Sequence, residues 1–134
     1  NRKIKRKFSN TENQDVFFDW VHNAIVNEGK IVGEISYIFC SDAYLLKINV
    51  EHLQHDTFTD IITFNYCEDN LISSDIFISI DRVLENSKLF NTSFHNELRR
   101  VMIHGVLHLV GYDDKTDDEK VLMRSREDFY INLR

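Results

Sequence analysis

Apolar residues recur along this chain with two different periods, and each period predicts one kind of secondary structure. Spacings of three and four residues are typical of amphipathic helices, and short runs of β-branched and aromatic residues are typical of strands. Helices are predicted over 12–28, after the cap Ser41-Asp42 with an apolar face from Ala43 to Leu53, for about ten residues from Asp81, from Thr92 or Ser93 to Gly111, and from Thr116 onward. Strands are predicted over 2–8, 31–40, 58–66 and 75–80.

The order of these elements is βαβαββααα, which predicts an α+β fold: a small four-stranded mixed sheet with about five helices packed on it. The chain has 134 residues, of which 43% are hydrophobic, and this is enough for one domain with a buried core. We therefore expect a single domain over residues 1–134. No apolar run approaches the roughly 20 residues that span a bilayer, so no membrane association is predicted.

Composition indicates in which cellular compartment the protein works and which kinds of partner it binds. The first residues are polar and basic and lack the apolar segment of a secretory signal, so we expect a cytoplasmic protein. Cys40 and Cys67 each end an apolar run and are interpreted as free thiols, which fits a reducing compartment. The net charge of −6 argues against broad electrostatic capture of nucleic acid.

The run from His104 to Asp114 carries the strongest chemical signal in the sequence. His104 and His108 are four residues apart, so on a helix both imidazoles lie on one face and point at one metal ion. Gly111 is suited to end that helix because it adopts a positive φ without a Cβ clash. The chain then turns back and offers Asp113 or Asp114 as a third ligand. Three protein ligands and an open position are typical of a hydrolytic zinc site.

The spacing of this run also matches a peptidase pattern, with one decisive difference. If Asp114 is the third ligand, the offsets are those of the metzincin pattern His-Glu-x-x-His-x-x-Gly-x-x-His. Those peptidases use the Glu after the first histidine as general base. Here that position is Gly105, which moves no proton, so peptidase chemistry by that route is not predicted.

The same run resembles the signature His-Gly-x-Leu-His-Leu-x-Gly-Tyr-Asp-His of the YbeY family of bacterial endoribonucleases. The ten positions from His104 to Asp113 fit, and Asp114 stands where the family has its third histidine. Glu97-Leu98 precedes the metal helix at the family's usual distance. Three upstream segments are also similar to the family: Ile48-Asn49, Thr59-Asp60-Ile61-Ile62-Thr63-Phe64 and Ser74-Asp75-Ile76.

The resemblance implies a metal-dependent endoribonuclease that prefers single-stranded RNA and acts in rRNA maturation and ribosome quality control. It implies association with the ribosome or ribosomal proteins, and one zinc ion held by His104, His108 and Asp114. A carboxylate in place of a histidine lowers the net charge of the metal and its ligands, and such a set also suits other divalent metals. The expected nucleophile is a water activated by the ion, and no general base is identified.

Supporting roles near the metal are less defined by the sequence. Asp113 is a rival ligand, interpreted instead as a hydrogen-bonding neighbour of the ligands. Asp75 opens a strand, where it either orients a metal-bound imidazole or caps the strand. Asp60 is interpreted as fixing a local turn. His22 and His95 are predicted to lie on helix surfaces.

The family usually has an arginine after an aromatic residue, where this chain has His52-Leu53. An arginine fork would hold a phosphate, and a leucine does not. Four residues are candidates to take its place: His52, His55, Arg100 and Lys115.

Two other functions remain compatible with these residues. One is a metallohydrolase acting on protein or on a small molecule, which Gly105 disfavours in the peptidase case. The other is a ribosome-assembly factor that keeps the fold without catalysis, which Leu53 and Asp114 favour.

Overall fold

The computed structural model describes residues 11–53 and 59–133, with side chains from Phe17 to Glu51 and from Thr59 to Leu133. The elements in these ranges are α1 (Thr11–Asn27), β1 (Ile31–Cys40), α2 (Asp42–Leu53), β2 (Ile61–Asn65), β3 (Leu71–Ser79), α3 (Ile80–Leu89), α4 (Phe94–Leu109) and α5 (Asp117–Leu133). The α+β prediction with five helices is confirmed.

The sheet has three strands in the described residues, against the four that we predicted. The difference has a simple origin, because the fourth strand was predicted over 2–8 and those residues lie outside the described ranges. The order of the remaining elements is the predicted one. The strand predicted over 75–80 begins earlier, at Leu71.

The sheet is mixed, with the strand order β1-β3-β2. The central strand β3 pairs in parallel with β1 and antiparallel with β2, so Phe77 lies opposite both Ile38 and Ile62. A parallel pair needs a crossover connection, and α2 with β2 supplies it between β1 and β3. The antiparallel pair is joined by a short turn in which Asp69 has a φ of 54°.

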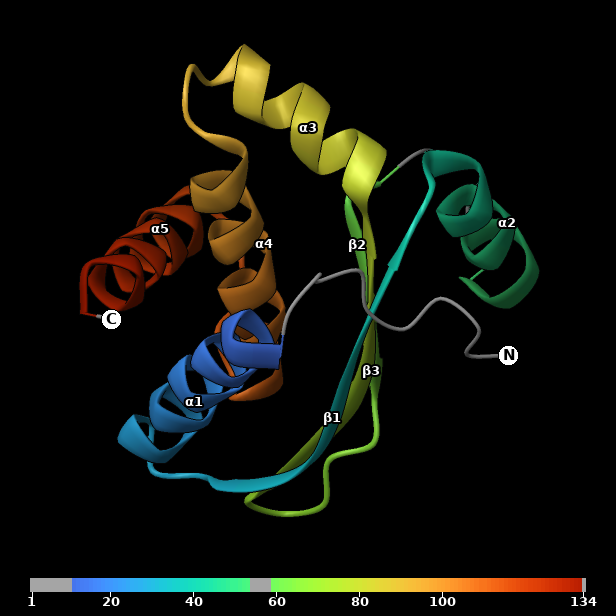
Figure 1. Cartoon of the computed structure of the whole chain (residues 1–134). Coiled ribbons are helices and arrows are strands. Elements are labelled where there is room, and N and C mark those ends of the chain that lie inside the picture. Colours follow the sequence, from blue (N-terminus) through green and yellow to red (C-terminus); the bar gives the residue numbers. More distant parts are fainter. Residues whose placement is uncertain (1–10, 54–58, 134) are drawn as a thin grey trace.

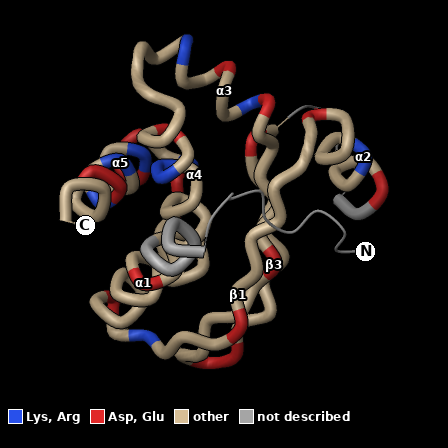
Figure 2. Tube along the Cα trace, viewed as in Figure 1, with Lys and Arg blue, Asp and Glu red and all other residues tan. Residues whose placement is uncertain are grey.

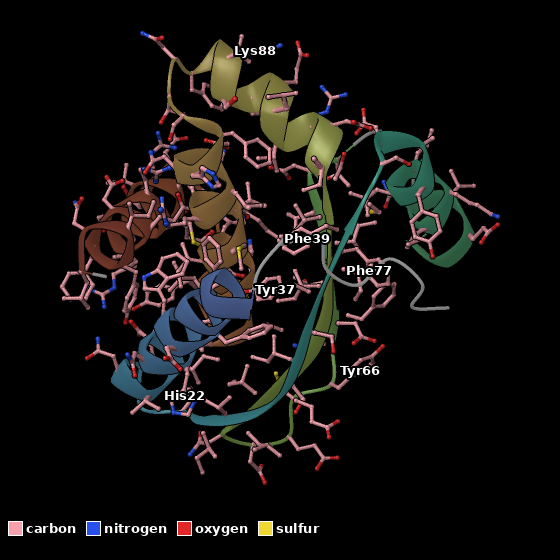
Figure 3. All side chains as sticks on the ribbon, viewed as in Figure 1. His22, Tyr37, Phe39, Tyr66, Phe77 and Lys88 are labelled. Carbon is pink, nitrogen blue, oxygen red and sulfur yellow. The ribbon has the colours of Figure 1, made fainter. Side chains whose placement is uncertain are left out.

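Helices cover both faces of the sheet, and the main core lies on one of them. Figure 1 shows α1, α4 and α5 on one side, α2 on the other and α3 at one end of the sheet. Tyr37 and Phe39 point toward α1 and α4, whereas Phe77 points away from them (Figure 3). Phe77 instead packs against a smaller cluster that includes Leu45 and Ile62.

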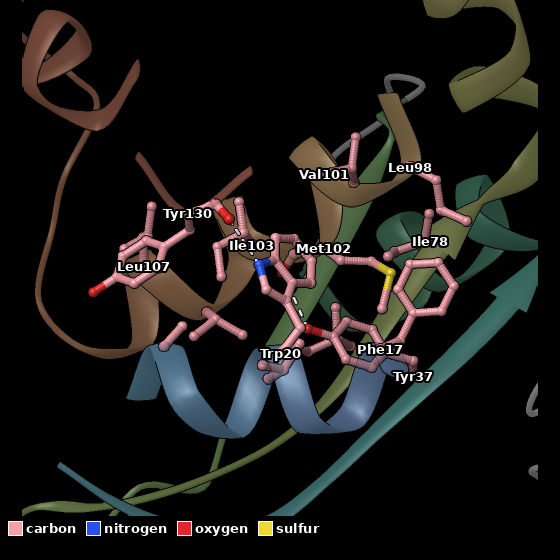
Figure 4. Packing of buried hydrophobic residues seen from close by; sticks show 14 of the residues in the cluster. Phe17, Trp20, Tyr37, Ile78, Leu98, Val101, Met102, Ile103, Leu107 and Tyr130 are labelled. Atoms are coloured by element: carbon pink, nitrogen blue, oxygen red, sulfur yellow. Dashed lines mark hydrogen bonds between the residues drawn. The ribbon is translucent and has the colours of Figure 1, made fainter. Parts of the chain in front are cut away.

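Two long-range hydrogen bonds fasten the main core (Figure 4). The Trp20 indole N–H of α1 donates to the backbone carbonyl of Tyr130 in α5 at 2.8 Å. The Tyr37 hydroxyl of β1 donates to the carbonyl of Met102 in α4 at 3.1 Å. Each apolar side chain buried around them stabilises the fold by about 1.5–3 kcal/mol. The result is a fixed frame for α4, which carries both histidines.

Helix α4 begins and ends at residues that satisfy its free backbone groups. The Ser93 side chain accepts a hydrogen bond from the Asn96 backbone N–H, which caps the first turn. At the other end Gly111 has a φ of +120°. The N–H of Tyr112 then donates back to the carbonyl of Leu107 at 2.9 Å. Both boundaries agree with the sequence prediction.

Gly105 lies where α4 crosses the sheet. A Cβ at this position would be 2.8 Å from Ile61 Cδ1 and 3.2 Å from Thr63 Cγ2. The absence of a side chain therefore lets the helix approach β2 closely. None of the described helices has the length and apolar character needed to cross a membrane.

Candidate metal centre

Three side chains converge at the end of α4. The Nε2 atoms of His104 and His108 each lie 3.3 Å from Oδ2 of Asp114. The two imidazole rings stand nearly perpendicular, with centroids 4.7 Å apart. One donor atom from each of the three residues lies within 4.8 Å of the other two. The i, i+4 spacing thus places both rings on one helix face, as the sequence indicates.

The turn that carries Asp114 is anchored to α1 and α5 through Tyr112. The Tyr112 hydroxyl donates to Glu28 Oε1 at 2.9 Å, and the Arg126 guanidinium donates to Glu28 Oε2 at 2.8 Å. The Tyr130 hydroxyl also donates to Glu28. Burial alone would raise the pKa of Glu28, but the hydrogen bonds from Tyr130, Arg126 and Tyr112 outweigh it and lower that pKa. Glu28 is therefore a charged anchor for the turn.

A carboxylate from α5 fixes the orientation of His104. Glu127 Oε2 lies 2.6 Å from Nδ1 of His104, and the Glu127 side chain is only 6% exposed. A carboxylate offers only acceptors, so Nδ1 carries the proton and Nε2 is left with its lone pair toward Asp114. Burial acts to lower the pKa of His104, but the hydrogen bond and charge of Glu127 and the charge of Asp114 outweigh it, so the pKa is raised.

Arg100 holds Glu127 in place. Its Nη1 donates to Glu127 Oε1 at 2.9 Å and its Nη2 donates to Asp128 Oδ1 at 2.7 Å. Figure 2 shows acidic and basic residues together on α5 beside α4. This ordered chain from Arg100 through Glu127 to His104 is the arrangement by which proteins orient a metal-binding imidazole.

The donor set fits a divalent transition metal. Two imidazole nitrogens and one carboxylate oxygen converge, and the fixed tautomer of His104 directs its lone pair into the cluster. The three side chains remain between 25% and 37% exposed, which leaves room for a water or a substrate atom.

The other predicted residues are not brought to this cluster. Asp113 is exposed, and no side-chain hydrogen bond or ion pair reaches it from the described residues. Asp75 lies next to Ile76, whose side chain faces Gly105 of α4, so Asp75 points to the opposite face of the sheet. There the Tyr66 hydroxyl lies 3.5 Å from it. The side chain of His52 lies outside the described part of the chain.

The structure describes only some of the residues that could replace the family's arginine. The Arg100 guanidinium already binds Glu127 and Asp128, and Lys115 is exposed. The side chains of Leu53 and His55 are outside the described residues. His22 and His95 are exposed on α1 and α4, as predicted.

Comparison with known proteins agrees with this arrangement. The family model described as "Endoribonuclease YbeY" matches residues 1–133. The chain belongs to the endoribonuclease YbeY family.

Curated YbeY relatives match over most of their length. The endoribonuclease YbeY of Flavobacterium johnsoniae is 57% identical over 122 residues, which is 91% of this chain and 88% of that protein. The endoribonuclease YbeY of Bacteroides thetaiotaomicron is 45% identical over 116 residues, which is 87% of this chain and 85% of that protein. A solution structure from Thermotoga maritima aligns with a TM-score of 0.68 at 26% identity, covering 94% of this chain and 83% of that one.

Sequence reasoning missed one residue of this YbeY site, and a signal for it exists. Glu127 is buried together with Met123, Tyr130 and Ile131, at the spacing of one helix face. A charged residue inside such an apolar stripe is unusual unless it has a partner. The identity of the partner, His104, is 23 positions away and cannot be read from local spacing.

Two further carboxyl groups of this YbeY chain lie near Glu127. Glu97 is buried on α4, and burial raises its pKa. Asp60 precedes β2, and burial raises its pKa as well, against the charge of His104, which lowers it. The backbone carbonyl of Asp60 accepts a hydrogen bond from the Ser79 N–H at 3.0 Å, a bond that does not involve the side chain, so the predicted role of the Asp60 carboxyl group in a local turn stays a prediction.

Proposed function

We propose that this chain cleaves single-stranded RNA at a divalent metal ion held by His104, His108 and Asp114. As a member of the endoribonuclease YbeY family it is an endoribonuclease, and its RNA substrate follows from that name. The observation that carries the proposed site is the convergence of the three side chains at 3.3 Å.

The chain's own residues have distinct roles in this proposal. A divalent ion in this position supplies Lewis acidity, which makes a water more acidic and polarises a phosphoryl oxygen. His104 and His108 would each bind the metal through an imidazole nitrogen. Glu127 keeps Nδ1 of His104 protonated, so that Nε2 has a free lone pair for the metal. Tyr112, anchored on Glu28, holds the turn so that Asp114 faces both imidazoles.

The finer assignments rest on the family resemblance and on the donor set. We propose one zinc ion in a single domain over residues 1–134. Because Asp114 replaces a third histidine, other divalent metals also suit the site. The proposed setting is rRNA maturation and ribosome quality control in the cytoplasm, on the ribosome or with ribosomal proteins as partners.

The decisive experiment compares histidines of the same helix. His108→Ala and His104→Ala should bind metal much more weakly and lose cleavage of a fluorescent single-stranded RNA. His95→Ala removes an exposed histidine of α4 and should behave as the wild type in both measurements. Cleavage by His108→Ala at the wild-type rate, or a wild-type protein that takes up no divalent metal on titration, would refute the proposed site.

Two alternative functions, a peptidase and a non-catalytic assembly factor, predict different results. Peptidase action through position 105 conflicts with the packing, because a side chain there would meet Ile61 and Thr63 rather than the metal cluster. The departures at Leu53 and Asp114 favour an assembly factor without catalysis. That function would replace ours if His108→Ala loses metal in vitro yet supports normal rRNA processing in cells.

A further inference from the structure

A cavity of about 260 Å³ opens on the far side of His104 from Asp114, where Glu127 binds Nδ1. Its walls come from four parts of the chain: the segment before β2, α3, α4 and α5. The lining residues that matter here are Asp60, Asn86, Phe90, Glu97, His104 and Arg124. His104 thus belongs both to the metal cluster and to this cavity, so a molecule bound in the cavity lies next to the reacting phosphate.

Glu97 is a buried acidic residue in the wall of this cavity. The residue is 5% exposed, yet no side-chain hydrogen bond reaches its carboxyl group from residues 11–53 or 59–133. Its carboxyl oxygens are not sealed from the cavity, so a molecule bound there can donate hydrogen bonds to them. Arg100 acts on it only through its charge, because that guanidinium binds Glu127 and Asp128.

The mouth of the cavity offers a flat apolar surface. Phe90, the residue that ends α3, is 58% exposed and makes no ring contact within the described part of the chain. Asn86, one turn earlier, adds an amide that both donates and accepts. Unstacked bases of single-stranded RNA are recognised by stacking on aromatic rings and by hydrogen bonds to their edges.

Size and charge distinguish the moiety that fits. The volume lies below the roughly 300 Å³ at which pockets for drug-sized ligands begin, so one base fits better than a whole nucleotide. Three carboxyl groups line the cavity, those of Asp60, Glu97 and Glu127, against two guanidinium groups, those of Arg100 and Arg124, so the balance of charge disfavours a phosphate. The oxygens of Asp60 and Glu97 can accept hydrogen bonds from base N–H groups. Guanine offers two adjacent N–H donors on its Watson–Crick edge, which match the two oxygens of one carboxylate.

We propose that this cavity binds a base of the RNA next to the scissile phosphate, with Phe90 stacking on it and Glu97 accepting from its edge, and that guanine is preferred. The inference rests on the proposed ribonuclease function and adds sequence preference to it. Glu97 is here a base-binding residue and not a metal ligand.

The test uses short oligouridylates that carry a single central guanosine, adenosine or cytidine. The wild type should cut the guanosine substrate with a kcat/KM roughly tenfold or more above that of the adenosine substrate. Glu97→Gln should bring the ratio of these two values close to one, because an amide no longer offers two acceptors. Glu85→Gln changes an exposed acid of α3 outside the cavity and should keep the wild-type ratio.

A second pair of variants tests the cavity without changing the buried Glu97. Phe90→Ala should raise KM for all three substrates, whereas Leu89→Ala removes a neighbouring side chain that is 72% exposed and should leave KM unchanged. Equal wild-type cleavage of all three substrates, a ratio retained by Glu97→Gln, or equal effects of the Phe90 and Leu89 variants would overturn the base site.

Failure of this inference is distinguishable from failure of the nuclease proposal. Fluorescence anisotropy of the same oligonucleotides with the His108→Ala protein measures the guanosine preference without cleavage. A preference in binding with no RNA cleavage by the wild type under any divalent metal would refute the nuclease function and keep the base site. RNA cleavage without a guanosine preference in either measurement would keep the nuclease function and refute the base site.

Discussion

Glu127 and His104 share a hydrogen bond of 2.6 Å that joins α5 to α4. The bond leaves Nε2 of His104 as the atom that faces Asp114 and His108. Because Arg100 binds the other oxygen of Glu127, the carboxylate is held from two sides. The position of a proposed metal ligand on α4 is thus set by a residue of another helix.

Loss of the hydrogen bond between Glu127 and His104 should weaken the affinity of the protein for zinc. Glu127→Gln keeps the size of the side chain and removes its charge, so His104 loses its charged acceptor. The dissociation constant for zinc should rise by roughly tenfold to hundredfold. Competition with a chromogenic chelator measures it.

Asp128→Asn is the matched control. It also removes a charged partner of Arg100, but Asp128 makes no contact with His104. The zinc affinity of this variant should stay within a few fold of the wild type. If both variants weaken zinc binding equally, the cause is the altered pairing of Arg100 and not the hydrogen bond between Glu127 and His104.

Tyr112→Phe tests the anchor of the turn that carries Asp114. The variant removes one donor from the charged Glu28, and a hydrogen bond to a charged group is worth about 1.5–3 kcal/mol. We expect a lower melting temperature and a severalfold weaker affinity for zinc. Tyr66→Phe removes an exposed hydroxyl beside Asp75 and should change neither. Unchanged metal affinity in Tyr112→Phe would show that the turn holds its shape without this bond.

Gly111→Ala tests the end of α4. The φ of +120° is a conformation that residues with a Cβ rarely adopt, so alanine should destabilise the fold by more than about 1 kcal/mol. Urea unfolding followed by circular dichroism gives the difference in the free energy of unfolding. Ser125→Ala, on the exposed face of α5, should lie within about 0.5 kcal/mol of the wild type. A Gly111 variant as stable as this control would contradict the strained turn.

Glu97→Gln should stabilise the protein in a pH-dependent way. Burial raises the folded-state pKa of Glu97 above its ordinary value of 4.5, so the carboxyl group favours folding below that value. This contribution is lost as the pH rises through the folded pKa. The melting temperature of the variant should therefore exceed that of the wild type at pH 7, and the two should converge near pH 4. An equal difference at both values would attribute the effect to packing alone.

The periodicity of the sequence predicted the helices well, because apolar residues recur at helical spacing and caps mark both ends of α3 and α4. Ser93 before α4 and Gly111 after it are local signals, and the helix ends where they indicate. The start of β3 was not predicted, because Ser73 and Ser74 interrupt the apolar pattern. The pairing of Ile31 with Leu71 and of Ile35 with Ser74 extends that strand, and such pairing is not visible in local propensity.

In the candidate site, too, the residues close together in the sequence were predictable and the long-range contacts were not. His104, His108 and Asp114 lie within eleven consecutive residues, so helix geometry and one turn bring them together. Glu127 and the cavity beside it depend on how α5 packs against α4, and this packing arises from the whole core. A short motif therefore indicates the proposed metal ligands but leaves out the residues that orient them.

Gly105 also separates this fold from the zinc peptidases whose ligand spacing it shares. A glutamate at this position would supply the His-Glu-x-x-His part of the peptidase pattern, with Asp114 still in place of the third histidine. A side chain at position 105 would meet Ile61 and Thr63, so its carboxylate would enter the apolar layer between helix and sheet, at a cost in stability. The two kinds of site thus share a ligand spacing, but in this fold position 105 faces the sheet, and a proton-transferring residue for the cluster would have to come from another part of the chain.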